Sequence, residues 1–347
     1  MKVLSLKQQR NKVSNGKKVP TIFDVAELSG VSISTISRVI NAPEKVNLIT
    51  RQKVYEAIDK LGFVPQAEAR ARALRFKGRI GVITPFFTAP SFVQRLRGIA
   101  ATLSKENFDL IIYTVDSNNR LQSYLSSLPL TGNLDGLVIV SLPVADADVK
   151  RLLDHDLPTV LIEFPHPFLN SVEINDVEGG RMATEYLISK GHTRIAFLGD
   201  TDLPEYSIHP VSLRLKGFRQ AVKNANLDIP KEFVRLAPYN QERARVIAKE
   251  LLDSPNPPTA VFAATDLQAL GVLKAARQLN VKIPEQLAII GFDDLDMAEY
   301  EDLTTIRQHL DESGRIAVEI LLSHIAESSR PVQHITIPLS IVERLTA

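Results

Sequence analysis

The stretch "TAVFAATDLQALGVLKAARQLNVKIPEQLAIIGFDD", residues 259–294, decides the fold of most of the chain. Two short apolar runs, "TAVFAATD" and "LAIIGFDD", flank an amphipathic segment of helical period at residues 266–279. Continuous apolar strands that are joined through a helix are typical of a parallel sheet covered by helices on both faces. The stretch therefore predicts a strand, helix and strand of an α/β protein.

The same alternation continues from residue 79 to the end of the chain. Further apolar runs are "RIGVIT", "DLIIYTV", "DGLVIVS", "PTVLIEF" and "RIAFLGD", and helical period recurs at 92–106, 178–190, 212–225 and 241–252. At least nine strands are too many for one compact doubly wound domain, and the series restarts at "RIAFLGD". We therefore expect two similar α/β lobes that face each other across a cleft. Ligands bind beyond the carboxyl ends of parallel strands, so the informative side chains should directly follow each strand.

Residues 20–64 contain no strand run and predict three short helices, with Thr21, Ser32 and Asn47 as their N-caps. Within them, "AELSGVSISTIS" has the spacing of a helix-turn-helix. Gly30 permits the left-handed turn between the first two helices, and Ile36 is apolar where the second helix packs on the first.

A helix-turn-helix that binds DNA places the N-terminal part of its second helix in the major groove. Ile33 and Ser34 are then expected to face base edges, and Arg38 to reach a guanine edge. Side chains suited to phosphate contacts are Thr21, Thr35, Ser37 and Asn41. The alternative for each hydroxyl group is a local cap or a solvated surface position, and for Thr35 the two interpretations are nearly equal. A purely structural helical hairpin is the competing interpretation of the whole motif.

Charge is distributed unevenly along the 347 residues, although the net charge is only +1. Residues 1–79 hold 16 Lys and Arg against 6 Asp and Glu, whereas the remaining residues hold 25 against 34. A basic N-terminal part on an acidic body points to an anionic partner, most simply nucleic acid.

Several functional classes find no support in the sequence. The chain has no cysteine, its seven histidines lack metal-ligand spacing, and no phosphate-binding loop or nucleophile motif follows a strand, so we expect no metal, no cofactor and no enzyme. No apolar run approaches the length of a membrane span, and residues 1–19 are basic without the apolar region of a signal peptide. We expect a cytoplasmic protein with a short disordered basic tail.

The sequence closely resembles the lactose/galactose repressor (LacI/GalR) family over residues 20–347. The pieces that carry the resemblance include "TIFDVAELSGVSISTISRVIN", "TRQKVYEAIDKLGFVP", "GGRMATEYLISKGHTRIAFLGD", "RLKGF" and "LTTIRQ". The resemblance implies a transcriptional regulator, often a repressor, that binds a palindromic operator as a dimer. It also implies a periplasmic-binding-protein-like unit of doubly wound parallel sheets that binds a small-molecule effector.

The resemblance divides the chain into four parts. These are a tail at 1–19, the helix-turn-helix domain at 20–64, a hinge helix and linker at 65–79, and an effector-binding and dimerisation domain at 80–347. Within the last, lobe 1 is expected at about 80–177 and 309–337, and lobe 2 at about 178–308 and 338–347. The effector, the operator, the direction of the response and the choice between dimer and tetramer stay open.

The hinge segment "PQAEARARALRFKGRIGV", residues 65–82, concentrates cations that include Arg70, Arg72 and Arg75. In the family a leucine of this segment enters the minor groove and kinks the DNA. Matching the motif "ARAL" makes Leu74 that residue, whereas counting without gaps places Arg72 there, where a narrow minor groove favours arginine. Both alternatives stay open, beside a solvated linker that contacts nothing.

The resemblance also implies a set of effector contacts. Arg214 matches an arginine that binds sugar hydroxyls or an acidic group, and Asp293 matches an acidic contact near the hinge between the lobes. Glu163 and Thr265 stand where the family often has Asp and Asn. Aromatic side chains that can form an apolar wall are Phe86, Phe92 and Phe292, each of which is otherwise a core residue. The apolar pocket mouth leaves the effector open between a carbohydrate and a nucleobase-like or other small metabolite.

Overall fold

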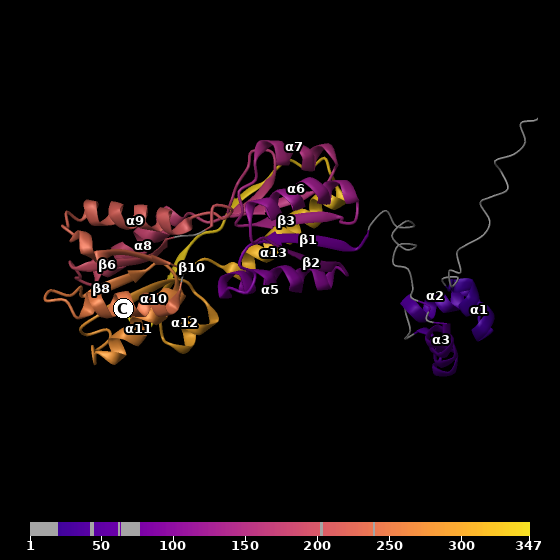
Figure 1. Cartoon of the computed structure of the whole chain (residues 1–347), viewed down its shortest axis with the longest axis horizontal. Helices are drawn as coiled ribbons and strands as arrows, with labels where there is room; N and C mark the ends of the chain where they lie inside the picture. The colour runs from indigo at the N-terminus through magenta and orange to yellow at the C-terminus, as the bar shows by residue number, and fades with distance from the viewer. Residues whose placement is uncertain (1–19, 42–44, 62, 64–76, 202–203, 239) are drawn as a thin grey trace, which may run out of the picture. The chain divides into compact units, whose positions relative to one another are not determined.

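A computed structural model describes residues 20–41, 45–61, 63, 77–201, 204–238 and 240–347. The chain divides into two compact units, Met1–Arg75 and Phe76–Ala347, here called the headpiece and the two-lobed unit (Figure 1). Each unit has its own buried apolar cluster.

The described part of the headpiece contains three helices. Its helices are α1 (Ile22–Ser29), α2 (Ile33–Asn41) and α3 (Leu48–Leu61). One apolar cluster holds them together, and its buried members are Val25, Ile36, Val39, Val54, Ala57 and Phe63. The expected apolar contact of Ile36 is confirmed, since its side chain is fully buried.

Local polar contacts set the helix ends of the headpiece. Gly30 ends α1 with a φ of 66°, the left-handed conformation that glycine adopts without a steric cost. The Oγ of Ser32 accepts a hydrogen bond from the backbone N–H of Thr35 at 3.3 Å, and Asn47 Oδ1 accepts one from Thr50 at 2.8 Å. The caps expected at Ser32 and Asn47 are therefore confirmed.

Lobe 1 is built on a six-stranded parallel sheet in the order β11-β5-β4-β3-β1-β2. Its strands are β1 (Arg79–Thr84), β2 (Asp109–Thr114), β3 (Gly136–Val140), β4 (Thr159–Ile162), β5 (Asn170–Glu173) and β11 (His334–Thr336). Its helices are α5 (Pro90–Lys105), α6 (Asn118–Thr131), α7 (Asp146–Asp154) and α13 (Leu310–Ala326). Alternate strand residues bury themselves under α5 and α13 on one face and under α6 and α7 on the other.

Lobe 2 repeats this design with the sheet order β12-β10-β9-β8-β6-β7, in which only β12 is antiparallel among the described strands. Its strands are β6 (Ile195–Thr201), β7 (Val234–Pro238), β8 (Ala260–Ala263), β9 (Ala288–Asp293), β10 (Thr304–Arg307) and β12 (Ser340–Val342). The helices α8 (Asp176–Ser189) and α9 (Pro210–Asn224) cover one face. The other face carries α10 (Gln241–Leu252), α11 (Asp266–Gln278) and α12 (Asp296–Tyr300).

The chain passes between the two sheets three times. The passages lie between β5 and α8, between β10 and α13, and between β11 and β12, so each lobe contains residues from distant parts of the sequence (Figure 1). Residues 308–309, in the second passage, directly follow β10 and precede α13.

The fold class expected from the sequence is confirmed, with helices in the headpiece and two parallel-dominated sheets beyond it. The central strands lie where the apolar runs predicted them. Within the part of the chain that the structure describes, no helix combines the length and hydropathy needed to cross a bilayer.

Candidate functional site

A cavity of about 430 Å³ lies between the lobes, at the carboxyl ends of both sheets. From lobe 1 it receives the segment after β1 and the residues that follow β3 and β4, Ser141 and Glu163. From lobe 2 it receives the ends of β6, β7 and β9, the residue after β10, and the segments that begin α9 and α11. This is the position at which parallel sheets bind ligands.

Four residues that line the cavity have positive φ angles without being glycine. The angles are 42° at Phe86, 53° at Ser141, 69° at Glu163 and 126° at Asp293. Such conformations are costly and persist where the surrounding structure enforces them, often at ligand sites. The backbone therefore holds these four side chains at the cavity in unfavourable conformations.

Glu163 is held in place on the lobe 1 side of the cavity. The Nη2 of Arg95 and the Oγ of Ser141 each donate a short hydrogen bond to its carboxylate. Arg95 is itself buried, and its Nε donates to Ser313 Oγ at 3.0 Å. Burial acts to raise the pKa of Glu163, but the Arg95 charge and the Ser141 hydrogen bond outweigh it and hold the pKa below its ordinary value.

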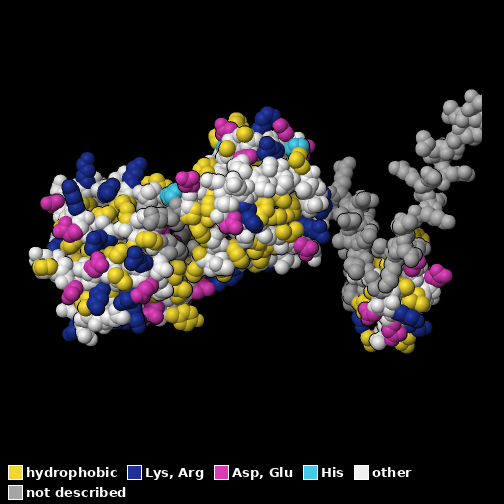
Figure 2. All heavy atoms as spheres, viewed as in Figure 1, with side chains coloured by type: hydrophobic (Ala, Val, Ile, Leu, Met, Phe, Trp, Pro, Cys, Tyr) yellow, Lys and Arg dark blue, Asp and Glu magenta, His cyan; other side chains and the backbone are white. Residues whose placement is uncertain are grey.

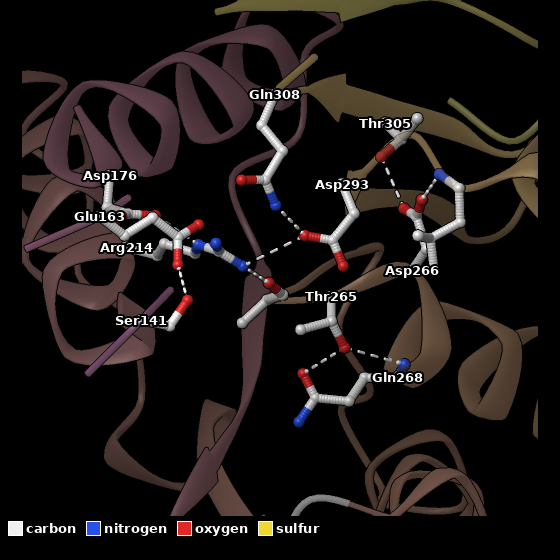
Figure 3. A network of polar contacts seen from close by, with 12 residues as sticks. Ser141, Glu163, Asp176, Arg214, Thr265, Asp266, Gln268, Asp293, Thr305 and Gln308 are labelled. Carbon is white, nitrogen blue, oxygen red and sulfur yellow. Dashed lines mark hydrogen bonds and ion pairs between the residues drawn. The ribbon is translucent and has the colours of Figure 1, made fainter. Parts of the chain in front are cut away.

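Arg214 is the central cation of the lobe 2 side (Figure 3). Its Nε donates to Asp176 Oδ1 at 2.8 Å, its Nη1 donates to the carbonyl of Ala264 at 2.6 Å, and the same Nη1 lies 3.7 Å from Asp293 Oδ1. The guanidinium also covers the ring of Phe292 at 3.7 Å. Burial opposes the charge of Arg214, yet Asp176 and Asp293 keep its pKa above the ordinary value.

Asp293 connects the arginine to the passage between the lobes. The side-chain amide nitrogen of Gln308 donates to Asp293 Oδ1, as Figure 3 shows. Burial raises the pKa of Asp293 to about 7, although the Arg214 charge and the Gln308 hydrogen bond act in the opposite direction.

Thr265 and Asp266 shape the cavity from β8. The Oγ of Thr265 accepts the backbone N–H of Gln268 at 3.2 Å and so caps α11. Asp266 lies behind the cavity, where its carboxylate accepts Thr305 Oγ1 at 2.6 Å and the backbone N–H of Leu295 at 2.8 Å. Thr265 thus faces the cavity while Asp266 ties the strands behind it together.

Two oxygen atoms of the cavity lack a hydrogen-bond partner. Asp200 Oδ1 and Gln308 Oε1 are buried, and neither receives a donor from the residues that the structure describes. Burial raises the pKa of Asp200 to about 6, against the influence of the Arg214 charge. A buried acceptor without a partner is rare in proteins, and a ligand that donates hydrogen bonds would satisfy both atoms.

Aromatic rings form the mouth of the cavity. Phe86 meets Phe92 edge to face with ring centroids 6.0 Å apart, and it lies 6.3 Å from the ring of Tyr206 in lobe 2. Phe86 and Phe92 line the cavity. Such a surface suits the apolar face of a sugar or a planar ring.

Most of the residues expected at the effector site come together in this cavity, but one does not. The cavity is lined by Phe86, Phe92, Glu163, Arg214, Thr265 and Asp293. The assignment of Phe292 to the cavity wall is wrong, because its ring is fully buried in the apolar cluster under α8 and α9. Strand residues alternate between the two faces of a sheet, so Phe292 and Asp293 point to opposite sides of β9.

Sequence reasoning missed six polar residues of the cavity, Ser91, Arg95, Ser141, Asp200, Ser207 and Gln308. Three of them carried a usable signal, since Ser141, Asp200 and Gln308 stand at or directly after strands. Arg95 lies within α5 and carried none. The described residues contain no cluster of His, Asp and Glu that could hold a metal ion.

The headpiece presents a second candidate surface on α2. Ile33, Ser34, Ser37 and Arg38 are exposed, and their spacing places them on the face of the helix opposite the buried Ile36. Thr35 is half-buried, and its Oγ1 lies 2.9 Å from Ser32 Oγ at the start of the helix.

The remaining expected DNA contacts are placed as follows. Thr21 is exposed at the start of α1, where the carboxylate of Asp24 accepts its backbone N–H at 2.7 Å. Asn41 is the last residue of α2, and its side chain lies outside the described part. Arg70, Arg72 and Leu74 also lie outside the described residues.

Comparison with known proteins places both units in one family of regulators. Residues 21–66 match the family model for bacterial regulatory proteins of the lacI family, and residues 184–347 match that for a periplasmic binding protein-like domain. The ribose operon repressor of Escherichia coli (strain K12) is 32% identical over 335 residues, which cover 94% of this chain and 99% of the relative.

Two solved structures share the architecture. A LacI family transcriptional regulator from Enterococcus faecium with bound ribose is 31% identical and has a TM-score of 0.67, covering 77% of this chain and 98% of that one. The lac repressor dimer bound to operator and the anti-inducer ONPF is 25% identical with a TM-score of 0.74, covering 95% and 99%.

Proposed function

Because the chain belongs to the lacI family of bacterial regulatory proteins, a family of DNA-binding transcriptional repressors, we propose that it binds a palindromic operator as a homodimer under the control of a small-molecule effector. The observation that carries the proposal is the pairing of two surfaces in one chain. The headpiece exposes a polar face on α2, and the two-lobed unit contains a cavity at the ends of its strands in which charged groups stand among apolar side chains.

The proposed DNA contacts divide into two kinds. Ile33, Ser34 and Arg38 read base edges in the major groove, and Arg38 provides a bidentate contact to guanine. The phosphate contacts, which set the register on the duplex, come from Thr21, Thr35, Ser37 and Asn41. The exposure of Ser34, Ser37 and Arg38 on one face of α2 supports this division.

The hinge proposal rests on the family resemblance. Arg70 contacts phosphate, and either Leu74 or Arg72 enters the minor groove at the centre of the operator. Replacing Leu74 and Arg72 separately with Ala and measuring DNA bending distinguishes the two, since only the inserted residue is needed for the kink. Bending that survives both replacements contradicts the proposal.

The proposed effector is a carbohydrate that occupies the cavity between the lobes. A volume of about 430 Å³ is within the range of small-molecule sites, and the polar groups of Glu163, Arg214, Thr265 and Asp293 suit hydroxyl groups. Phe86 and Phe92 provide a surface for the apolar face of a sugar ring. The ribose named for the Escherichia coli relative and bound in the Enterococcus faecium structure supports this choice.

The proposed dimer uses the outer edge of lobe 1. There β2 is the edge strand and exposes Ile112, and α5, which packs against β2, exposes Val93. Figure 2 shows hydrophobic side chains covering much of this lobe around β2 and α5. Exposed apolar patches of this kind mark interaction surfaces.

Selection of duplexes from a random pool, followed by binding measurements at several salt concentrations, tests the DNA-binding part of the proposal. A palindromic sequence should be enriched, and its affinity should fall steeply with salt because phosphate contacts release counterions. Arg38→Ala should weaken binding and relax the preference for guanine at one position of each half-site by about 1–3 kcal/mol.

Lys53→Ala is the matched control for Arg38→Ala, because it removes one exposed cation from α3 and not from the face of α2. The control should leave the base preference unchanged. No enrichment of any sequence, or an affinity that does not change with salt, contradicts the proposed function.

A further inference from the structure

We infer that Asp200 makes the cavity selective for an uncharged sugar rich in hydroxyl groups, and that it excludes sugars that carry a phosphate or carboxylate. The inference rests on the proposed function, because it names the chemical class of the carbohydrate effector. It concerns a residue that no sequence motif indicated.

The first argument is the balance of charge around the cavity. Two guanidinium groups, those of Arg95 and Arg214, face three carboxyl groups that line the cavity and a fourth that pairs with Arg214 behind its wall. These carboxyl groups belong to Glu163, Asp176, Asp200 and Asp293. An anionic ligand would add negative charge to a site in which acids already outnumber bases.

The second argument is that both cations are already engaged. Arg95 donates to Glu163 and to Ser313, and Arg214 donates to Asp176 and to the carbonyl of Ala264. Both guanidinium groups keep N–H donors that these contacts do not use, but a phosphate that drew either cation away from its carboxylate would break a buried ion pair. Breaking a buried ion pair in this way leaves an uncompensated charge.

The third argument is the nature of the unpartnered atoms. Asp200 Oδ1 and Gln308 Oε1 are both acceptors, and they come from two different strand ends of lobe 2. The amide nitrogen of Gln308 is fixed by Asp293, which leaves its oxygen for the cavity (Figure 3). Two buried acceptors require donors from the ligand, and hydroxyl groups supply them whereas the oxygens of a phosphate dianion do not.

Of Asp200 and Gln308, Asp200 is the residue that discriminates between neutral and anionic ligands. It lies near the end of β6, and Arg214 and His209 are the charged or titratable groups that act on it. Unlike Glu163 and Asp293, it has no hydrogen bond from a side chain of the protein among the described residues. Its carboxylate is therefore free to accept from a ligand hydroxyl and to repel a ligand anion.

Calorimetric titration of the full-length protein with matched sugars tests the inference. The probes are D-ribose with D-ribose 5-phosphate, D-glucose with D-glucose 6-phosphate, and D-glucosamine as a cationic ligand. We expect one neutral sugar to bind at least about tenfold more tightly than its phosphate, because the Asp200 carboxylate repels the negative charge of the phosphate.

Two variants separate the two roles of Asp200. Asp200→Asn keeps the shape of the side chain and an acceptor oxygen but removes the charge. The ratio of the Kd of the phosphate to the Kd of the neutral sugar should therefore fall by about tenfold. Asp200→Ala removes the acceptor oxygen as well and should raise the Kd for the neutral sugar by about tenfold. Glu205→Gln is the control, because Glu205 is an exposed acid of the segment between β6 and α9 and, unlike its neighbours Pro204 and Ser207, does not line the cavity.

Several outcomes would overturn the inference. An unchanged preference in Asp200→Asn, a phosphate that binds better than its neutral sugar, or D-glucosamine that gains affinity in Asp200→Asn would each do so. If no sugar binds, the carbohydrate effector of the proposed function fails together with the inference. Operator binding by the same preparations shows whether the variants are folded, and its presence separates a failed inference from a failed assignment as a repressor.

Discussion

Arg214 pairs with two carboxyl groups, those of Asp176 and Asp293. It therefore stabilises the fold in addition to being a candidate ligand contact. Its guanidinium joins Asp176, the carbonyl of Ala264 and Asp293, and it covers the ring of Phe292. The side chain is almost completely buried. Its removal therefore affects the folded state even before an effector is present.

We expect Arg214→Ala to lower the free energy of unfolding of the two-lobed unit by about 3–5 kcal/mol, because it leaves buried carboxylates without their cation. Urea unfolding measures the change. Adding Asp176→Asn to Arg214→Ala should recover part of the loss, since the amide needs no counter-charge. A single variant as stable as the parent contradicts the structural role.

Asp200 should make stability depend on pH. Its pKa is about 6 in the folded protein against 3.8 for an ordinary aspartate, so the folded state binds the proton more tightly than the unfolded state. The stability that this proton contributes is fully present below pH 3.8 and is lost as the pH rises through about 6. Relative to the parent, Asp200→Asn should gain stability over this window, on the order of 3 kcal/mol.

Denaturant unfolding of both proteins between pH 4 and pH 8 measures this gain, with Glu205→Gln as a control that changes nothing. A difference between parent and Asp200→Asn that stays constant with pH would show that Asp200 does not titrate in this range.

The candidate site was predictable where a side chain directly follows a strong strand. Glu163 and Asp293 satisfy that rule, whereas Arg95 lies within a helix and has the sequence appearance of a solvated cation. Arg95 is buried because the fold places Glu163 and Ser313, which are 68 and 218 residues away in the sequence, in hydrogen-bonding contact with it. Phe292 shows the reverse error, because a continuous apolar strand does not reveal which residues face the cavity.

At the scale of elements, one face of α2 packs into the headpiece and the other face is exposed. Ile36 and Val39 pack into the small apolar cluster of the headpiece, while Ile33 and Arg38 are exposed. Among the residues of the headpiece that the structure describes, this is the one apolar cluster, so the loss of one large side chain removes a considerable part of the stability of the unit.

We expect Ile36→Ala to cost about 2–5 kcal/mol, the usual range for such a truncation, and to unfold the headpiece. Operator binding should be lost while sugar binding and the thermal transition of the two-lobed unit are retained. Ile33→Ala is the matched control on the exposed face of α2, and it should keep the headpiece folded in circular dichroism. Operator binding that survives Ile36→Ala would contradict this account.

Elements were predictable according to how deeply they are buried. The central strands β1, β3, β8 and β9 are apolar on both faces and were read directly from the sequence. The short strands β11 and β12 were not, because sequences such as "HIT" and "SIV" carry too little pattern to separate a strand from a loop. Their place in the sheets is decided by partners far away in the chain.

At the scale of the whole molecule, the proposed dimer depends on the edge of lobe 1. Val93 is 50% exposed on α5 and Ile112 is 39% exposed on β2, where an unpaired strand edge also invites contact. A dimer that buries these side chains would bring two headpieces to one palindromic operator.

We expect Val93→Asp to shift the protein to the monomer, because a charge buried at an interface costs far more than the lost apolar contact. Sedimentation velocity measures the assembly, and operator affinity should fall with it. Leu153→Asp, which changes an exposed leucine of α7 instead, should leave the dimer intact. A dimeric Val93→Asp variant would move the proposed interface elsewhere.

The three passages between the sheets have a consequence for synthesis of the protein. Lobe 1 begins with β1 but acquires α13 and β11 only when residues 310–336 have been made, after all of lobe 2 except β12. Until then the face of its sheet that α13 covers is open, and the apolar residues on it, such as Val138 and Val160, lack part of their packing. A ribosome that stops before residue 336 therefore releases a chain in which these apolar residues stay partly uncovered, the kind of surface that makes an incomplete chain prone to aggregate.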